Sequence, residues 1–395
     1  MRTVFLTFAL WMLAAPLAAQ QDCVEFLGKC HNTGSSYVTV KLRQDGADLS
    51  GIGVLDWAES VELIGPEGQR PPVSIAALAN LPNLNNLRLE NLTVSDPGAL
   101  GELQVEDLGF KSVSADDFSG LARVAQLRKL RFVNVSGLPG LKLANLPPLV
   151  DLTLVDTPLP ALDGLERLTD LQSLVLANTG ATDLSAVAAL NLRRFIMRGE
   201  RLDDLSMLSG SPNLAFLVLN GSEVTSLDSL PHPDSLMNLS ALDSALEDIS
   251  ALSVAKKLRN LDLRGSKVAD VTGIHHLPLL EELDLRETPV SDLSPLANLR
   301  ALKKLWLTDT KVADLGPLAG LPSIEQLSIS GIPATQAYAL AALDKVTILW
   351  MNHTRVGDLK PLLDMDALQA LRIDDEKMVA RERLEQFIAQ RVLPE

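Results

Sequence analysis

The sequence has few aromatic residues and no excess of positive charge. Of its 395 residues only 4% are aromatic, and the formal net charge is −15 at pH 7, with a pI near 4.8. A protein that binds nucleic acid needs a basic surface to neutralise phosphates, so we expect no nucleic-acid partner. Beyond the N-terminus no apolar run approaches the roughly 20 residues that span a bilayer, so we expect no membrane span.

Signatures of catalysis and of metal binding are also missing. The five histidines lie in no HExxH or Cys/His zinc spacing, and the sequence has no GxSxG elbow, phosphate-binding glycine loop or dinucleotide fingerprint. We therefore expect no metal, no cofactor and no enzymatic activity. A catalytic triad assembled from distant parts of the chain is the alternative that these patterns leave open.

The N-terminus, MRTVFLTFALWMLAAPLAAQQDC, is typical of a secretory signal peptide. One positive charge at Arg2 precedes an apolar run, and small residues end at Ala18 and Ala19. This pattern predicts a signal peptide over residues 1–19 and an exported product, either periplasmic or extracellular. Polar residues at 20–22 precede Cys23, so we expect no lipid anchor there.

The only two cysteines, Cys23 and Cys30, follow the expected cleavage point. Export favours a disulfide between them, and so short a loop removes about 2–3 kcal/mol of denatured-state freedom in the chain-entropy model. We expect this disulfide to fasten the first elements of the mature chain. A redox pair, which more typically has the spacing CxxC, is the alternative.

Most of the chain repeats with a period of 22 residues. Residues 280–301 read LEELDLRETPVSDLSPLANLRA and residues 302–323 read LKKLWLTDTKVADLGPLAGLPS, with apolar residues at positions 1, 4, 6, 11, 14, 17 and 20 of each unit. Positions 4 and 6 predict a short strand, and positions 14 and 17 predict a helical turn on the opposite side. The units begin at Leu84, Val105, Leu127, Leu149, Leu171, Leu192, Leu214, Leu236, Leu258, Leu280, Leu302, Ile324, Val346 and Leu368, and the steps into Val105 and Leu192 are 21 residues.

A single unit is too small to fold alone. Ordering its backbone and side chains costs on the order of 33 kcal/mol, whereas about seven buried aliphatic side chains return roughly 10–20 kcal/mol. Stacking must supply the missing burial, so we predict an α/β solenoid, a leucine-rich-repeat horseshoe with a concave parallel sheet and short helical or 3-10 turns on the convex side. We expect an N-terminal cap with an irregular first repeat over residues 20–83, repeats over 84–373 and a C-terminal capping helix over 374–395.

The pattern LxxLxLxxTxVxDLSPLxxL at 280–299, slightly altered at 302–321 and 346–365, resembles the repeats of internalin-type bacterial leucine-rich-repeat proteins. The resemblance covers roughly residues 60–375 and implies recognition of a protein partner. One departure is that position 9, where that family usually carries Asn, carries Thr or Ser, whose hydroxyl we expect to satisfy backbone groups of the turn. These residues are Thr157, Thr179, Ser222, Ser244, Ser266, Thr288, Thr310 and Thr354.

Aspartate recurs at position 13, just before each expected helical turn. A carboxylate at this place caps free backbone amides, which is the role we predict. A calcium array is the alternative, but the glycine-rich nonapeptide of calcium-binding β-helices is missing. The aspartates are Asp183, Asp204, Asp248, Asp270, Asp292, Asp314 and Asp358.

Function should lie at positions 3, 5 and 7, which point outward from the concave face. In position 5, Trp306 and Trp350 flank the small Ser328 and should lie about 10 Å apart, forming a notch. Exposed tryptophan near arginine is typical of binding hot spots, although the charges here could simply pair along the sheet. The charged and polar neighbours are Asp262, Arg264, Glu282, Asp284, Arg286, Lys304 and Asn352, and a second, apolar patch comprises Val175, Ile196, Phe216 and Val218.

These observations predict an exported leucine-rich-repeat protein, monomeric and without a cofactor, that binds a protein partner through its concave face. The alternative is a glycan-binding protein of the cell envelope, in which Trp306 and Trp350 stack on sugar rings. Fold alone does not identify the partner.

Overall fold

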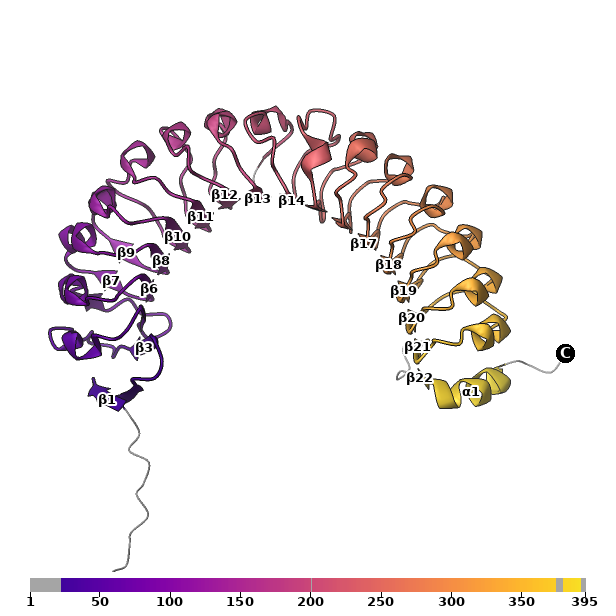
Figure 1. The fold of residues 1–395 in the computed structure, drawn as a ribbon, viewed down its shortest axis with the longest axis horizontal. Helices are drawn as coiled ribbons and strands as arrows, with labels where there is room; N and C mark the ends of the chain where they lie inside the picture. The colour runs from indigo at the N-terminus through magenta and orange to yellow at the C-terminus, as the bar shows by residue number, and fades with distance from the viewer. Residues whose placement is uncertain (1–22, 200, 374–378, 392–395) are drawn as a thin grey trace, which may run out of the picture.

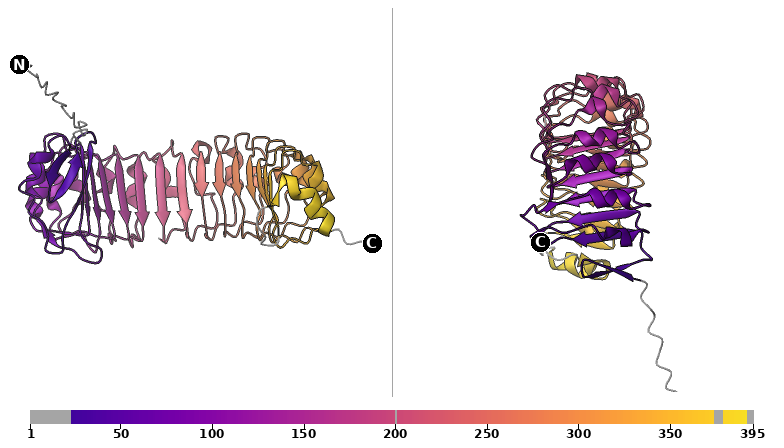
Figure 2. Two further views of the ribbon diagram at one scale, coloured as in Figure 1. Left: turned by 90° about the horizontal axis from the view of Figure 1, so that it is seen from below. Right: turned by 90° about the vertical axis from the view of Figure 1, so that its left-hand side faces the viewer.

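The computed structural model, which describes residues 23–199, 201–373 and 379–391, is an open horseshoe. Strands line its inner, concave side and short helices line its outer, convex side (Figure 1). Seen from below, the strands lie side by side in a single band (Figure 2). The predicted solenoid class is confirmed.

Within the described residues, the concave sheet contains seventeen strands. From β3 to β21 neighbouring strands pair in parallel, and the last, β22, pairs antiparallel with β21. The strands are β3 (Tyr37–Lys41), β4 (Ser60–Ile64), β6 (Asn86–Glu90), β8 (Asp107–Lys111), β10 (Lys129–Val133), β11 (Asp151–Val155), β12 (Ser173–Ala177), β13 (Arg194–Arg198), β14 (Phe216–Asn220), β15 (Asn238–Ser240), β16 (Asn260–Asp262), β17 (Glu282–Asp284), β18 (Lys304–Trp306), β19 (Gln326–Ser328), β20 (Ile348–Trp350), β21 (Ala370–Arg372) and β22 (Val379–Ala380). Because β3 and β4 belong to this sheet, it already runs through the segment that the sequence analysis assigns to the N-terminal cap.

The leucines at positions 4 and 6 form one continuous core between the sheet and the convex side. Leu283 and Leu285, for example, are fully buried. Register explains the continuity, because Leu261, Leu283 and Leu305 pair directly across neighbouring strands. Each repeat therefore completes the burial of the next, as the free-energy argument requires.

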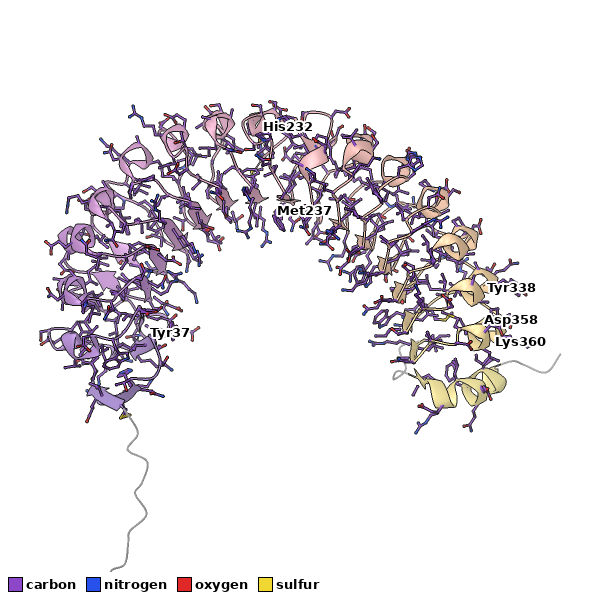
Figure 3. All side chains as sticks on the ribbon, viewed as in Figure 1. Tyr37, His232, Met237, Tyr338, Asp358 and Lys360 are labelled. Carbon is purple, nitrogen blue, oxygen red and sulfur yellow. A yellow bond between two sulfur atoms is a disulfide. The ribbon has the colours of Figure 1, made fainter. Side chains whose placement is uncertain are left out.

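The convex side is built from short 3-10 helices of three to six residues, as predicted. Figure 3 shows Tyr338, Asp358 and Lys360 on this outer side. The helices are η1 (Ile52–Leu55), η2 (Ala76–Asn80), η3 (Pro97–Glu102), η4 (Ser119–Arg123), η5 (Leu143–Asn145), η6 (Leu165–Arg167), η7 (Ser185–Ala189), η8 (Ser206–Leu208), η9 (Pro233–Ser235), η10 (Ser250–Val254), η11 (Thr272–Ile274), η12 (Ser294–Leu296), η13 (Gly316–Gly320), η14 (Tyr338–Ala342) and η15 (Lys360–Asp364). The short strands β5 (Pro72–Val73), β7 (Thr93–Val94) and β9 (Ser114–Ala115) form a second small parallel sheet.

The aspartates at position 13 cap these helices. The Ser294 amide, the first of η12, donates to the Asp292 Oδ1 at 2.8 Å, and the other six aspartates accept the equivalent bond. The capping prediction is confirmed. Within the described ranges, no group of three or more His, Cys, Asp or Glu side chains is arranged to hold a metal ion.

Most of the hydroxyls at position 9 form hydrogen bonds with backbone groups of the turn, as predicted. The Thr288 Oγ1 donates to the Leu285 carbonyl at 2.6 Å, and Ser244, Thr310 and Thr354 make the equivalent bond. Ser222 and Ser266 are exceptions, because each buried Oγ lacks a hydrogen-bond partner within the described part of the chain.

Position 8 carries a backbone constraint that the apolar pattern of the repeat does not reveal. In every unit from Leu84 to Val346 this residue has a positive φ, which turns the chain away from the strand. Glycine, Asn and Asp tolerate this left-handed conformation best and fill most of the column. The residues are Asn91, Ser112, Asn134, Asp156, Asn178, Gly199, Gly221, Asp243, Gly265, Glu287, Asp309, Gly331 and His353.

Both ends of the solenoid carry additional elements. Cys23 and Cys30 form the predicted disulfide within an antiparallel pair of strands, β1 (Cys23–Phe26) and β2 (Lys29–Asn32). At the other end η16 (Arg381–Arg383) leads into α1 (Leu384–Arg391), where Leu384 and Ile388 are buried in the core. The predicted signal peptide, and residues 374–378 and 392–395 of the predicted capping helix, lie outside the described residues. Within the described ranges, no helix has the length and apolar character that crossing a bilayer requires.

Candidate functional site

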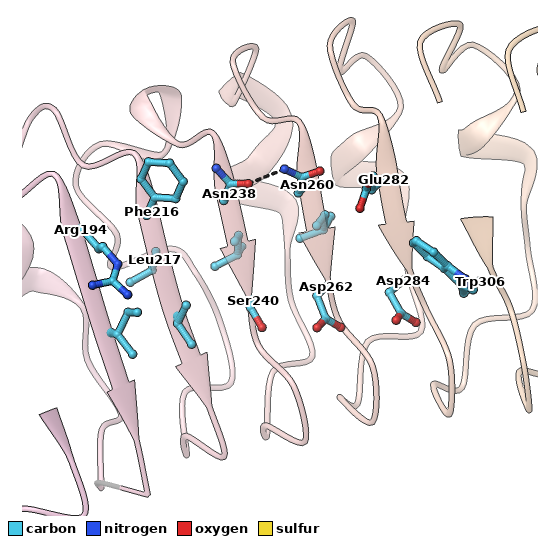
Figure 4. A pocket seen from close by; sticks show the side chains of 14 residues that line it. Arg194, Phe216, Leu217, Asn238, Ser240, Asn260, Asp262, Glu282, Asp284 and Trp306 are labelled. Atoms are coloured by element: carbon cyan, nitrogen blue, oxygen red, sulfur yellow. Dashed lines mark hydrogen bonds between the residues drawn. The ribbon is translucent and has the colours of Figure 1, made fainter. Parts of the chain in front are cut away.

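A pocket of about 450 Å³ lies on the concave face between β13 and β18. The lining residues come from six consecutive strands, β13 to β18, and Figure 4 shows their side chains on neighbouring repeats. The residues that line it are Arg194, Ile196, Phe216, Leu217, Val218, Asn238, Leu239, Ser240, Asn260, Leu261, Asp262, Glu282, Asp284 and Trp306.

Strand register arranges most of these side chains in two rows, and the remaining three, Leu217, Leu239 and Leu261, belong to the buried position-4 column between them. Position 3 gives the row Arg194, Phe216, Asn238, Asn260 and Glu282, each paired with the next across neighbouring strands. Position 5 gives the row Ile196, Val218, Ser240, Asp262, Asp284 and Trp306 in the same way. Neighbouring members of a row lie about 4.8 Å apart because that is the spacing of hydrogen-bonded strands.

One end of the pocket is apolar. Phe216 is 44% exposed, Val218 is half-buried, and Ile196 is only 8% exposed because its neighbours on the sheet cover it. Arg194 stands beside Phe216, and its Nη1 donates to the Ser173 Oγ at 3.3 Å. An aromatic ring left this exposed on a concave surface offers contact area to a ligand.

The middle of the pocket is polar. Asn260 donates its Nδ2 to the Asn238 Oδ1 (Figure 4), and Ser240 donates to the Asn220 Oδ1 at 2.8 Å. Asp262 accepts a hydrogen bond from the backbone amide of Arg264 at 3.1 Å. Burial raises the pKa of this carboxyl, and the nearby charge of Asp284 raises it further, while the hydrogen bond and the charges of Arg264 and Arg286 oppose the shift.

At the other end, two charges are paired and a tryptophan closes the pocket. Asp284 is 7% exposed and accepts from the Arg286 Nε at 2.9 Å and 3.0 Å through its two oxygens. Glu282 pairs with the Lys304 Nζ at 2.6 Å. The half-buried Trp306 lies next to Asp284 in the position-5 row.

The predicted site residues divide into two groups. Asp262, Glu282, Asp284 and Trp306 line the pocket, whereas Arg264, Arg286, Lys304, Ser328, Trp350 and Asn352 do not. Ser328 does lie between Trp306 and Trp350 in the register, but it is only 5% exposed and its Oγ is 2.7 Å from the Thr308 Oγ1. Ser328, which lies at the base of the predicted notch, is therefore buried. The notch as a binding site stays a prediction.

The pocket also joins parts of the two patches that were predicted as separate surfaces. Ile196, Phe216 and Val218 of the apolar patch share it with the acidic residues, while Val175 of that patch lies outside its lining. Arg194, Asn238, Ser240 and Asn260 were missed. Comparing position 3 with position 5 across all units would have placed these residues beside one another, because both columns face the same side.

The fold is similar to solved leucine-rich-repeat structures. A leucine-rich-repeat protein of Leptospira interrogans matches with a TM-score of 0.69 and 22% identity, over 86% of this chain and 90% of that chain. An internalin (InlF) of Listeria monocytogenes matches with a TM-score of 0.54 and 19% identity, over 89% of this chain and 91% of that chain. No protein-family model matches the sequence, and no curated protein does. The resemblance to internalin-type leucine-rich-repeat proteins is confirmed at the level of the fold.

Proposed function

We propose that this chain is an exported, monomeric binding protein that recognises a protein partner through the pocket between β13 and β18. The observation that carries the proposal is the composition of the pocket, which has an apolar end, a polar middle and a tryptophan at the other end. Protein interfaces combine exposed aromatic anchors with a few hydrogen-bonding groups in this way.

Export is supported by the disulfide between Cys23 and Cys30, because such bonds persist in oxidising compartments. The product would be periplasmic or extracellular. In this proposal the protein binds without performing chemistry, since Asp284 and Glu282 are held by Arg286 and Lys304 in fixed ion pairs that shape the surface.

A glycan of the cell envelope is the second candidate ligand. The observation that favours it is the register, which places Trp306 and Trp350 two strands apart with the small Ser328 between them. Two half-buried indoles separated by about 10 Å could stack on sugar rings of one chain. In that case the binding surface would extend beyond the pocket, from β18 to β20.

The two tryptophans give a matched pair of test variants. We would immobilise the mature protein, capture partners from envelope proteins and from a glycan array, and measure the affinity of the captured partner for Trp306→Ala and Trp350→Ala. For a protein in the pocket, Trp306→Ala should weaken binding at least about thirtyfold, the effect of removing a hot-spot aromatic. Trp350→Ala should bind like wild type, because Trp350 lies outside the pocket lining.

Thermal melts of the same variants separate binding from folding. Both tryptophans are surface side chains outside the leucine core, so unfolding should change little. If both variants lost affinity for a glycan, the second candidate would be supported. If neither variant lost affinity for any captured partner, the pocket would not be the binding site.

A further inference from the structure

We propose that the partner segment bound in the pocket is extended and carries a lysine or arginine that pairs with Asp262, close to an apolar side chain that packs on Phe216 and Val218. The inference deepens the proposed function and rests on it. It concerns the chemistry of the ligand, which the fold does not determine.

Asp262 differs from the other carboxylates of the pocket in forming no salt bridge within the described ranges, although the charges of Arg264 and Arg286 act on it from beyond salt-bridge distance. Asp284 and Glu282 are bound by Arg286 and Lys304, whereas the hydrogen bond that Asp262 accepts comes from a backbone amide. A half-buried carboxylate without an ion pair is costly to keep charged. A cation from a ligand would remove this cost, so the pocket is complementary to positive charge.

The neighbours of Asp262 fit a long cationic side chain. Trp306 lies two strands away in the same row, and an indole face attracts lysine or arginine when the side chain passes over it. At the opposite end Arg194 carries a positive charge that repels a second cation. The ligand should therefore bind in one orientation, with its cation towards β16 and its apolar group towards β14.

Register sets the spacing that the ligand needs. Val218, Ser240 and Asp262 are consecutive in the position-5 row, which separates Val218 from Asp262 by about 10 Å. An extended chain advances about 3.3 Å per residue, so the apolar and cationic residues should be about two to four positions apart, given the reach of lysine.

The amide pair can hold the backbone of such a segment. Asn238 and Asn260 are bonded to each other through one oxygen and one nitrogen. Within the described ranges this leaves the Asn238 Nδ2 and the Asn260 Oδ1 as a neighbouring donor and acceptor. An extended peptide presents the matching carbonyl and amide groups.

The test is a random-peptide phage selection on the immobilised wild-type mature protein, counter-selected on the Trp306→Ala variant. Peptides retained only by wild type depend on the pocket and would be synthesised for calorimetry. We expect them to carry lysine or arginine about two to four residues from an aliphatic or aromatic residue. Their affinity should fall as salt is raised, since a charge pair contributes.

Asp262→Asn is the decisive variant. The Asn Oδ1 can still accept the Arg264 amide, so folding should be retained and is checked by circular dichroism. Removal of the charge should weaken binding at least about tenfold and remove most of the salt dependence. Asp344→Asn, which removes a charge from an exposed turn residue before β20, is the matched control and should bind like wild type.

The possible failures are distinguishable. Pocket-dependent peptides that are acidic or uncharged, or that bind Asp262→Asn as tightly as wild type, would overturn this inference and leave the proposed function standing. A selection that returns no peptide sensitive to Trp306→Ala would count against both.

Discussion

Replacing Gly331 with alanine tests the left-handed turn that ends each strand. Gly331 has a φ of +68°, and a Cβ at this position would overlap the Oδ1 of Asp309, which holds the same place one repeat earlier. The left-handed conformation costs a residue with a Cβ about 1–2 kcal/mol, and Asp309 must also move. We expect Gly331→Ala to destabilise the chain by at least that amount.

The reverse kind of substitution, from a residue with a Cβ to glycine at position 8, should increase the free energy of unfolding. Glu287 occupies position 8 with a φ of +59°, and its side chain is exposed. Glu287→Gly relieves about 1–2 kcal/mol of backbone cost but gives the unfolded chain more freedom, worth about 0.5–1 kcal/mol. The net expectation is stabilisation by about 0.5–1 kcal/mol.

Urea unfolding followed by tryptophan fluorescence measures both effects. Trp306 and Trp350 lie in the repeats adjacent to Gly331, so they report local opening. Gly357→Ala is the control, because Gly357 is exposed, lacks a positive φ and has open space around its Cβ position. The left-handed backbone requirement at position 8 would be refuted by either of two results. One is that Gly331→Ala unfolds at the same urea concentration as Gly357→Ala, and the other is that Glu287→Gly is destabilising.

Three further predictions concern the core, the disulfide and the pocket. Leu283→Asp places a charge in a fully buried position and should abolish cooperative unfolding over several repeats; a circular-dichroism melt like that of wild type would contradict this. Thiol labelling of the exported, unreduced protein should modify neither Cys23 nor Cys30, which are disulfide-bonded, and stoichiometric labelling would refute the bond. Burial raises the pKa of Asp262, so its ionised form lowers stability at neutral pH and this penalty fades as the pH falls through the folded-state pKa. Asp262→Asn should therefore be more stable than wild type at neutral pH, with a difference that shrinks in acid; a difference independent of pH would exclude this cause.

Much of the scaffold follows from the sequence because each scaffold position has a strong local requirement. A charge at Leu283 or Leu285 would be buried, so these positions are always apolar and reveal the strand. Asp292 must accept the amide of Ser294, so its column reveals the start of the helix. Repetition over many units makes these requirements visible in a single chain.

Position 8 was harder to predict because its requirement is met by chemically different residues. Glycine, Asn and Asp share tolerance of positive φ but neither charge nor size, and Glu287 and His353 satisfy the backbone at a cost. An apolar pattern does not reveal such a column. Compatibility with a backbone conformation has to be considered separately from hydrophobicity.

The pocket was only partly predictable because facing outward does not determine exposure. Ile196 and Ser328 both point to the concave side, yet they are 8% and 5% exposed because neighbouring side chains cover them. Whether an outward residue is accessible depends on the sizes and conformations of four or more neighbours on adjacent strands. These are tertiary properties, and the repeat period alone does not contain them.

The sequence LDLR occurs at 261–264 and again at 283–286, and the two copies show how one pattern gives two roles. In the second copy Arg286 closes on Asp284 through both carboxylate oxygens. Both copies also share a bond from the arginine backbone amide to the aspartate, and in the first copy the Arg264 side chain adds no hydrogen bond or salt bridge to Asp262 within the described residues. Asp284 lies between Asp262 and Trp306 and is the more deeply buried of the two, and a charge removed from water gains more from an ion pair. Asp262 faces the small Ser240 on its other side, where the pocket is open. The same four residues therefore build a closed ion pair beside the tryptophan in one repeat and a carboxylate without a salt bridge in the pocket in the other, and it is this second carboxylate that we propose a partner neutralises.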